Sequence, residues 1–118
     1  MLAKVVDGQK VGRTLGFPTA NLAFFNPEEM PPSGVYAVEV CVKEQRFRGL
    51  LSVGVRPTFD TLPKEKLAEV HILDFDRDIY GEIIEISILR FIREVRRFDT
   101  AEELRAQIQR DIEGANAY

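Results

Sequence analysis

Residues 34–53 read Gly34-Val-Tyr-Ala-Val-Glu-Val-Cys-Val-Lys43-Glu-Gln-Arg46-Phe-Arg-Gly-Leu-Leu-Ser-Val53. The two halves of this stretch, Gly34–Lys43 and Arg46–Val53, are rich in β-branched and aromatic residues, and only Glu44-Gln45 lies between them. Such runs are typical of β-strands, and a two-residue link is typical of a hairpin. The stretch therefore predicts two neighbouring antiparallel strands.

Two further strand patterns and one helix pattern follow this hairpin. The strands are expected at Leu67–Leu73 and Gly81–Ile92, with a turn at 78–81 between them. The helix pattern has a capping box at Thr100-Ala-Glu-Glu103 and a stop signal at Gly114. Strands followed by a helix predict an antiparallel β-barrel or sandwich with a C-terminal helix packed on it. The apolar residues that define the helix, at steps of three and four, are Ala101, Leu104, Ile108, Ile112 and Ala115.

Length and charge restrict the function further. The chain has 118 residues, of which 45% are hydrophobic, which predicts one domain with a real core. Lys and Arg total 16 against 19 Asp and Glu, so the chain lacks the basic excess of nucleic-acid-binding proteins and we expect no nucleic-acid partner. The lone Cys41 and the lack of any apolar run near ~18 residues predict a cytoplasmic protein without a membrane partner.

The segment before the hairpin reads Gly8-Gln-Lys10-Val-Gly12-Arg13-Thr-Leu-Gly16-Phe-Pro18-Thr19-Ala-Asn21. Its glycines allow backbone amides to approach a polyphosphate, while Lys10 and Arg13 offset the negative charge. The segment is neither a Walker A loop nor a dinucleotide fingerprint, because no GK[ST] ending and no βαβ unit accompanies it. Phosphate binding and an ordinary mobile turn both remain open on this pattern alone.

Thr19 and Asn21 are candidate metal ligands. If the segment after Pro18 is extended, both side chains project from one face of a strand. Their neutral oxygens suit Mg²⁺, which takes its negative ligands from substrate phosphates. The alternative is that both side chains satisfy turn backbone groups.

Glu69 is a candidate general base. It shares one face of the expected strand Leu67–Leu73 with His71, so its carboxylate lies on a defined surface of a rigid element. The alternative is a solvated strand carboxylate. A chain with one histidine and one cysteine supplies no His/Cys metal site.

These patterns together resemble the riboflavin kinase family. Its signature is similar to Gly8-x-x-x-Gly12-Arg13-x-Leu15-Gly16-Phe17-Pro18-Thr19-Ala20-Asn21-Leu22, with a specific Pro-Thr-Ala-Asn core. The resemblance covers nearly the whole chain and implies a six-stranded antiparallel Greek-key β-barrel with a C-terminal α-helix. The further segments that agree, in order, are Gly34–Ala37, Val53–Phe59, Glu69–Phe75, Ile79–Gly81, Arg93–Phe98 and Gln107–Ile112.

The resemblance also implies a reaction, in which ATP with Mg²⁺ phosphorylates the ribityl 5′-hydroxyl of riboflavin to give FMN and ADP. Glu69 would be the catalytic base, and Thr19 and Asn21 would bind the magnesium and the phosphates. Arg93 and Phe98 would border the isoalloxazine ring of the flavin. The loop that would cover the ATP phosphates contributes Gly8, Lys10, Gly12 and Arg13.

The resemblance implies that residues 1–118 form a riboflavin kinase domain without the adenylyltransferase half that often precedes it in bacterial bifunctional enzymes. We therefore expect no conversion of FMN to FAD. The rival interpretation is a non-catalytic flavin- or nucleotide-binding β-barrel that acts as a sensor or carrier. Such a protein has no need for Glu69 together with Thr19 and Asn21.

Overall fold

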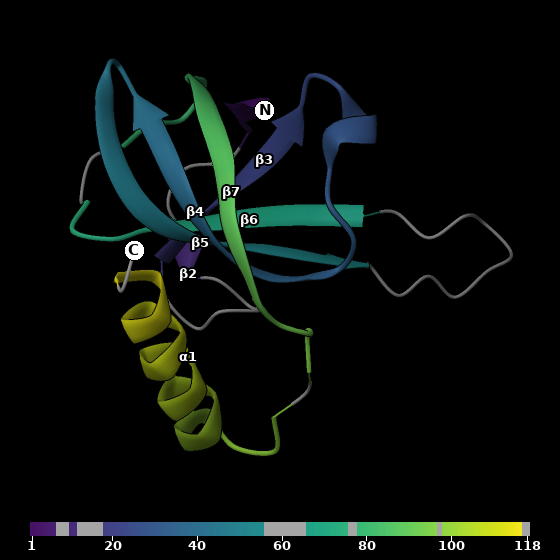
Figure 1. Ribbon diagram of the computed structural model, residues 1–118, viewed down its shortest axis with the longest axis vertical. Helices are drawn as coiled ribbons and strands as arrows, with labels where there is room; N and C mark the ends of the chain where they lie inside the picture. The colour runs from purple at the N-terminus through teal and green to yellow at the C-terminus, as the bar shows by residue number, and fades with distance from the viewer. Residues whose placement is uncertain (7–9, 12–17, 56–65, 76–77, 97, 117–118) are drawn as a thin grey trace, which may run out of the picture.

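The computed structural model describes residues 1–6, 10–11, 18–55, 66–75, 78–96 and 98–116 (Figure 1). Over these residues it consists mainly of β-strands, with a helix at the C-terminal end. The elements in chain order are β1 (Leu2–Val5), β2 (Lys10–Val11), β3 (Pro18–Phe24), the 3₁₀ helix η1 (Pro27–Glu29), β4 (Gly34–Val42), β5 (Gln45–Val55), β6 (Lys66–Ile72), β7 (Ile83–Arg93) and α1 (Ala101–Asn116).

Six of the described strands close into an antiparallel barrel. The strand order is β1-β7-β4-β5-β6-β3, and β1 also pairs with β3, so the first and last strands of this order meet. Three successive strands, β4, β5 and β6, are neighbours, and β7 returns to lie beside β4. This 4-1-2-3 arrangement is a Greek key. The expected six-stranded Greek-key barrel is therefore confirmed, and the short β2 adds to it by pairing with β3.

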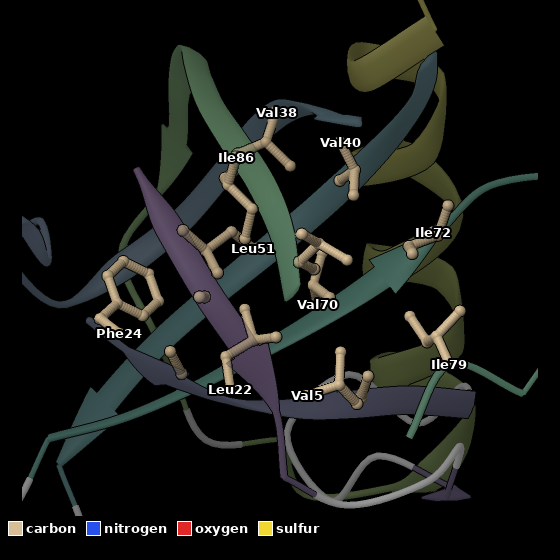
Figure 2. Close-up of a cluster of buried hydrophobic side chains, with 14 of the residues drawn as sticks. Val5, Leu22, Phe24, Val38, Val40, Leu51, Val70, Ile72, Ile79 and Ile86 are labelled. Atoms are coloured by element: carbon tan, nitrogen blue, oxygen red, sulfur yellow. The ribbon is translucent and has the colours of Figure 1, made fainter. Parts of the chain in front are cut away.

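Alternation along the strands fills the barrel with apolar side chains. In β4 the side chains of Val38 and Val40 are fully buried in the interior, whereas Glu39 between them is only partly buried. Figure 2 shows that side chains from all around the barrel meet in its centre. The labelled members of this core are Val5, Leu22, Phe24, Val38, Val40, Leu51, Val70, Ile72, Ile79 and Ile86.

Helix α1 covers part of the outer surface of the barrel (Figure 1). Ile108 and Ala115 are fully buried against Val35, Ala37 and Leu50, which point outward from β4 and β5. The Thr100 Oγ1 accepts a hydrogen bond of 3.1 Å from the Glu103 N–H, as the expected capping box requires. Among the described residues, no helix is long and apolar enough to cross a membrane.

The helix does not stop at Gly114 as the sequence predicts but continues to Asn116. A glycine inside a helix costs about 1 kcal/mol relative to alanine. The buried Ala115 lies beyond it and packs on the barrel, so tertiary packing outweighs the local preference.

The hairpin between β4 and β5 also differs from the expectation by one residue. Val42 pairs with Gln45, so the turn consists of Lys43 and Glu44 rather than Glu44-Gln45. Both turn residues have positive φ, 49° and 69°, which matches the backbone twist of a type I′ hairpin. Neither is the glycine or asparagine that normally marks such a turn.

The turn expected at residues 78–81 is present. The Asp78 Oδ1 accepts a 3.0 Å hydrogen bond from the Tyr80 N–H, and Gly81 follows with a φ of 82°, a value that favours glycine. This turn leads the chain from the end of β6 towards β7. The strand limits themselves, Lys66–Ile72 and Ile83–Arg93, lie within two residues of the expected ones.

Candidate active site

Glu69 lies in the middle of a row of polar side chains that crosses three strands. In the sheet register it is directly opposite Asn21 of β3 on one side and Ser52 of β5 on the other. Its neighbours in sequence, Ala68 and Val70, are buried in the barrel core, so Glu69 points to the outer surface. Glu69 is only partly exposed, and its Oε2 oxygen is buried. The carboxylate is therefore held on a fixed surface rather than extended into bulk solvent.

Thr19 and Asn21 share the outer face of β3. The residues that alternate with them, Ala20 and Leu22, belong to the barrel core. Thr19 is 3% exposed and Asn21 is partly exposed. The structure therefore brings together three of the residues singled out in the sequence: a hydroxyl, an amide and the Glu69 carboxylate on adjacent strands.

The glycine-rich segment is described only in part. The backbone of Lys10, in β2, lies directly opposite Thr19, which brings this short strand beside the row of polar side chains. Gly8, Gly12 and Arg13 lie outside the described residues. Their proposed contacts with phosphates, and that of the Lys10 side chain, remain predictions.

The donor atoms of this face suit a hard cation. Within the described ranges, no group of three or more His, Cys, Asp or Glu side chains could hold a metal ion. Thr19 and Asn21 offer neutral oxygens close to the Glu69 carboxylate on the adjacent strand. Oxygen ligands suit Mg²⁺, which usually keeps several waters and binds through substrate phosphates.

The other two residues singled out are Arg93, the last residue of β7, and Phe98, which lies between β7 and α1. Val35 pairs with Ser52 on one side and with Arg93 on the other, so Arg93 continues the row that contains Glu69. Three strand spacings separate the two residues, about 14 Å along the barrel surface. The guanidinium of Arg93 lies 5.6 Å from the centroid of the Phe98 ring.

Two residues of this surface are not among those singled out from the sequence. Ser52 is only 2% exposed and sits beside Glu69, although the strand pattern gives it no distinction. Asp111 is 1% exposed on α1 and forms an ion pair with Arg93, with 2.8 Å between the Arg93 Nη2 and the Asp111 Oδ2. A signal for Asp111 exists in the sequence, because it is three residues after Ile108 and four before Ala115, on the apolar side of the helix.

Comparison with known proteins gives one family. Residues 1–118 match the family model described as Flavokinase, riboflavin kinase. The bifunctional riboflavin kinase/FMN adenylyltransferase of Bacillus subtilis (strain 168) is 40% identical over 115 residues, which are 97% of this chain and 36% of that protein. The RNA-binding riboflavin kinase RibR of the same organism is 49% identical over 109 residues, 92% of this chain and 46% of that protein.

A solved structure also matches over nearly the whole chain. A crystal structure described as a macrolide-efflux protein from Streptococcus pneumoniae is 40% identical, with a TM-score of 0.87 over 99% of this chain and 38% of that chain. The chain thus spans less than half the length of each of these relatives.

Proposed function

The chain belongs to the riboflavin kinase family, and from this premise we propose that it transfers the γ-phosphoryl group of ATP to the ribityl 5′-hydroxyl of riboflavin. The observation that supports this reaction best is the position of Glu69, directly opposite Asn21 on the strand that also carries Thr19. One surface then offers a carboxylate for the hydroxyl and neutral oxygens for the phosphates and their metal. A flavin sensor or carrier needs no such combination.

In the proposed reaction the riboflavin hydroxyl oxygen attacks the γ-phosphorus of ATP. The bond between that phosphorus and the β–γ bridging oxygen breaks, and ADP leaves with the bond's electron pair. Glu69 accepts the proton of the hydroxyl late in the transition state, since phosphoryl transfer passes through a loose, largely dissociative state. The products are FMN and ADP.

Thr19 and Asn21 are the residues that would hold Mg²⁺ in this proposal. When bound, the ion would supply positive charge to the phosphates of ATP. The two side chains would hold it beside Glu69, because all three residues stand on adjacent, paired strands. Rigid strands serve this purpose better than loops, since the geometry of the reacting groups must be held closely.

The direct test is to incubate the 118-residue chain with riboflavin, ATP and Mg²⁺ and to separate the flavins by chromatography. We expect FMN that depends on both ATP and the divalent ion. A folded sample that forms no FMN at any divalent concentration, yet binds riboflavin or ATP, would favour the sensor or carrier. We also propose that the chain alone forms no FAD, and FAD in this assay would contradict that.

A role in RNA binding is named for the relative RibR, of which this chain spans 46%. We propose that the present chain does not share it, because its net charge is −3 and phosphate-backbone binding is driven by basic side chains. A gel-shift assay with RNA at low salt tests this, and a shift that salt abolishes would contradict it. The cytoplasmic location remains a prediction.

A further inference from the structure

The outer surface around β1, the strand that closes the barrel, carries apolar side chains that remain exposed. Leu2 of β1 is 44% exposed, and Ile83 of β7 is 55% exposed. Phe25, whose N–H donates to the Leu2 carbonyl oxygen at 3.1 Å, is also 55% exposed. These three residues, with the exposed Lys4 and Glu85, are called the closing face below.

Elsewhere on the barrel, the chain itself covers the apolar part of the outer surface. Val35, Ala37 and Leu50 point outward from β4 and β5, and α1 packs over them so that all three are fully buried. The apolar residues of the closing face stay exposed in the same structure. Single exposed apolar residues are ordinary on a protein surface, but a group of them on adjoining strands is typical of an interaction site.

The register of β1 and β7 arranges two charged and two apolar residues as a rectangle. Leu2 is directly opposite Glu85, and Lys4 is directly opposite Ile83. The rectangle measures about 5 Å between the strands and about 7 Å along each strand. Leu2 and Ile83 therefore occupy one diagonal, and Lys4 and Glu85 occupy the other.

Both charges of the rectangle are available to a partner. Lys4 and Glu85 are exposed, and within the described part of the chain neither of them forms an ion pair. Two charges close by do form one, since the Lys43 Nζ lies 3.6 Å from the Glu82 Oε1. The closing face thus offers one cation and one anion beside its apolar residues.

This arrangement is complementary to a second copy of itself. Two copies can pack face to face about a two-fold axis that runs along the diagonal from Leu2 to Ile83. Each Lys4 then lies over Glu85 of the partner subunit, within the reach of a lysine side chain. Leu2 and Ile83 each meet the same residue of the partner, so apolar groups face apolar groups and opposite charges face each other.

We propose that the closing face binds a second copy of this chain and that the two copies form a weak symmetric dimer. Five residues on each side are far fewer than the roughly 20–30 of a standard stable interface, so we expect a dimer Kd of roughly 100 µM. None of the five belongs to the candidate active site. The inference therefore goes beyond the proposed function and does not depend on it.

The experiment measures the mass of the full chain by analytical ultracentrifugation. Over roughly 5 to 500 µM protein at low salt, we expect a shift from monomer to dimer. A chain that stays monomeric at every concentration would overturn the proposal. The assay needs neither riboflavin nor ATP, so a failure of the proposed function leaves its outcome unaffected.

Charge reversal tests the predicted geometry. Lys4→Glu places two glutamates against each other in each contact, and Glu85→Lys places two lysines, so either variant should raise the dimer Kd about tenfold or more. The double variant restores opposite charges and should return to within about threefold of the parental Kd. A dimer that the single reversals leave intact, or that the double variant does not recover, would contradict the proposed axis.

The matched controls make the same charge changes on α1. Arg105→Glu and Glu113→Lys alter exposed residues of that helix and should dimerise as the parental chain does. Circular dichroism and the Tm show whether each variant is folded. If a charge reversal unfolds the chain, Ile83→Ser decides, because it removes exposed apolar surface from the same face and should raise the Kd about tenfold. An unchanged Kd for Ile83→Ser would also overturn the proposal.

Discussion

The position of Glu69 is fixed by the two strands, β3 and β5, that pair with its own strand β6. Hydrogen-bonded neighbours in β3 and β5 hold the strand that carries it, so its carboxylate can shift little without opening the sheet. The contact between β5 and β6 is close: a Cβ atom on Gly49 would lie only 2.8 Å from the backbone oxygen of His71. A larger residue at Gly49 would push β6 away, and Glu69 with it.

Glu69→Gln keeps the size of the side chain but cannot accept the substrate proton. We expect kcat to fall by ~10²- to 10⁴-fold, towards the lower end because the base acts late in a loose transition state. The fold and both substrate affinities should survive. Steady-state turnover at saturating riboflavin and ATP, with the Tm, measures this. The control is Glu85→Gln, an exposed carboxylate on the outer face of β7, and a near-parental kcat for a folded Glu69→Gln variant would remove Glu69 from the catalytic role.

Thr19→Val and Asn21→Ala each delete one oxygen of the proposed metal and phosphate site. We expect kcat/KM to fall about 100-fold or more, because the ion is then held less firmly against the phosphates. Calorimetric titration with ATP and Mg²⁺, without riboflavin, should show weaker binding. Ser87→Ala, an exposed hydroxyl on β7, is the control. If both variants bind ATP and Mg²⁺ as the parental chain does, the two residues have only a structural role.

Single residues were predictable where the pattern of one strand determines their face. Alternation alone places Thr19 with Asn21, and Glu69 on a defined surface. It cannot say that Asn21 and Glu69 become direct neighbours, because that depends on which strands pair and in what register. Asp111 was missed because an acidic residue on a helix is normally solvent-exposed, and its partner Arg93 is distant in sequence.

At the scale of elements, tertiary packing sets the boundaries of helices and strands wherever the local sequence signals are weak. Helix α1 begins at Ala101, directly after the predicted capping residue Thr100, but ends two residues after the expected stop. The hairpin turn at Lys43-Glu44 contains neither glycine nor asparagine, so the buried faces of β4 and β5 set the register. The capping signal was therefore sufficient to predict the start of α1. Tertiary contacts determined the end of α1 and the position of the turn between β4 and β5.

Thr100→Ala removes the hydroxyl that accepts the Glu103 N–H. We expect the free energy of unfolding to fall by about 0.5–2 kcal/mol, because a helix N-terminus loses its cap. Urea denaturation followed by circular dichroism measures this, and kinase activity at low temperature should be unchanged. Thr100→Ser retains the hydroxyl and should behave as the parental chain does. Equal stability of all three proteins would mean that the cap adds nothing to the fold.

At the scale of the whole molecule, closure of the barrel depends on β1. This four-residue strand pairs with β7 on one side and β3 on the other. A six-stranded Greek-key barrel could be expected from the family resemblance. The sequence patterns alone left a barrel and a sandwich open, because period-two alternation fits both.

Val5→Ala tests how much the closing strand contributes to stability. Val5 is fully buried in the barrel core, whereas Val6 next to it is 40% exposed. We expect Val5→Ala to lower the free energy of unfolding by about 2 kcal/mol, from lost burial and the cavity left behind. Val6→Ala should change it by less than about 0.5 kcal/mol. Both are measured by chemical denaturation, and equal effects would contradict the role assigned to β1.

The contact between Met1 and Ile86 has a consequence for how the chain is made. The amino group of Met1 donates to the Ile86 carbonyl oxygen at 2.9 Å, and the two residues are 85 positions apart. At a ribosomal speed of about 5–20 residues per second, β1 waits roughly 4–17 s for that partner to be synthesised. Only β3, the early partner of β1, is available during most of this time. The barrel should therefore close in order, with the β1–β3 pair that carries Asn21 formed early and the pairing of β1 with β7 formed last.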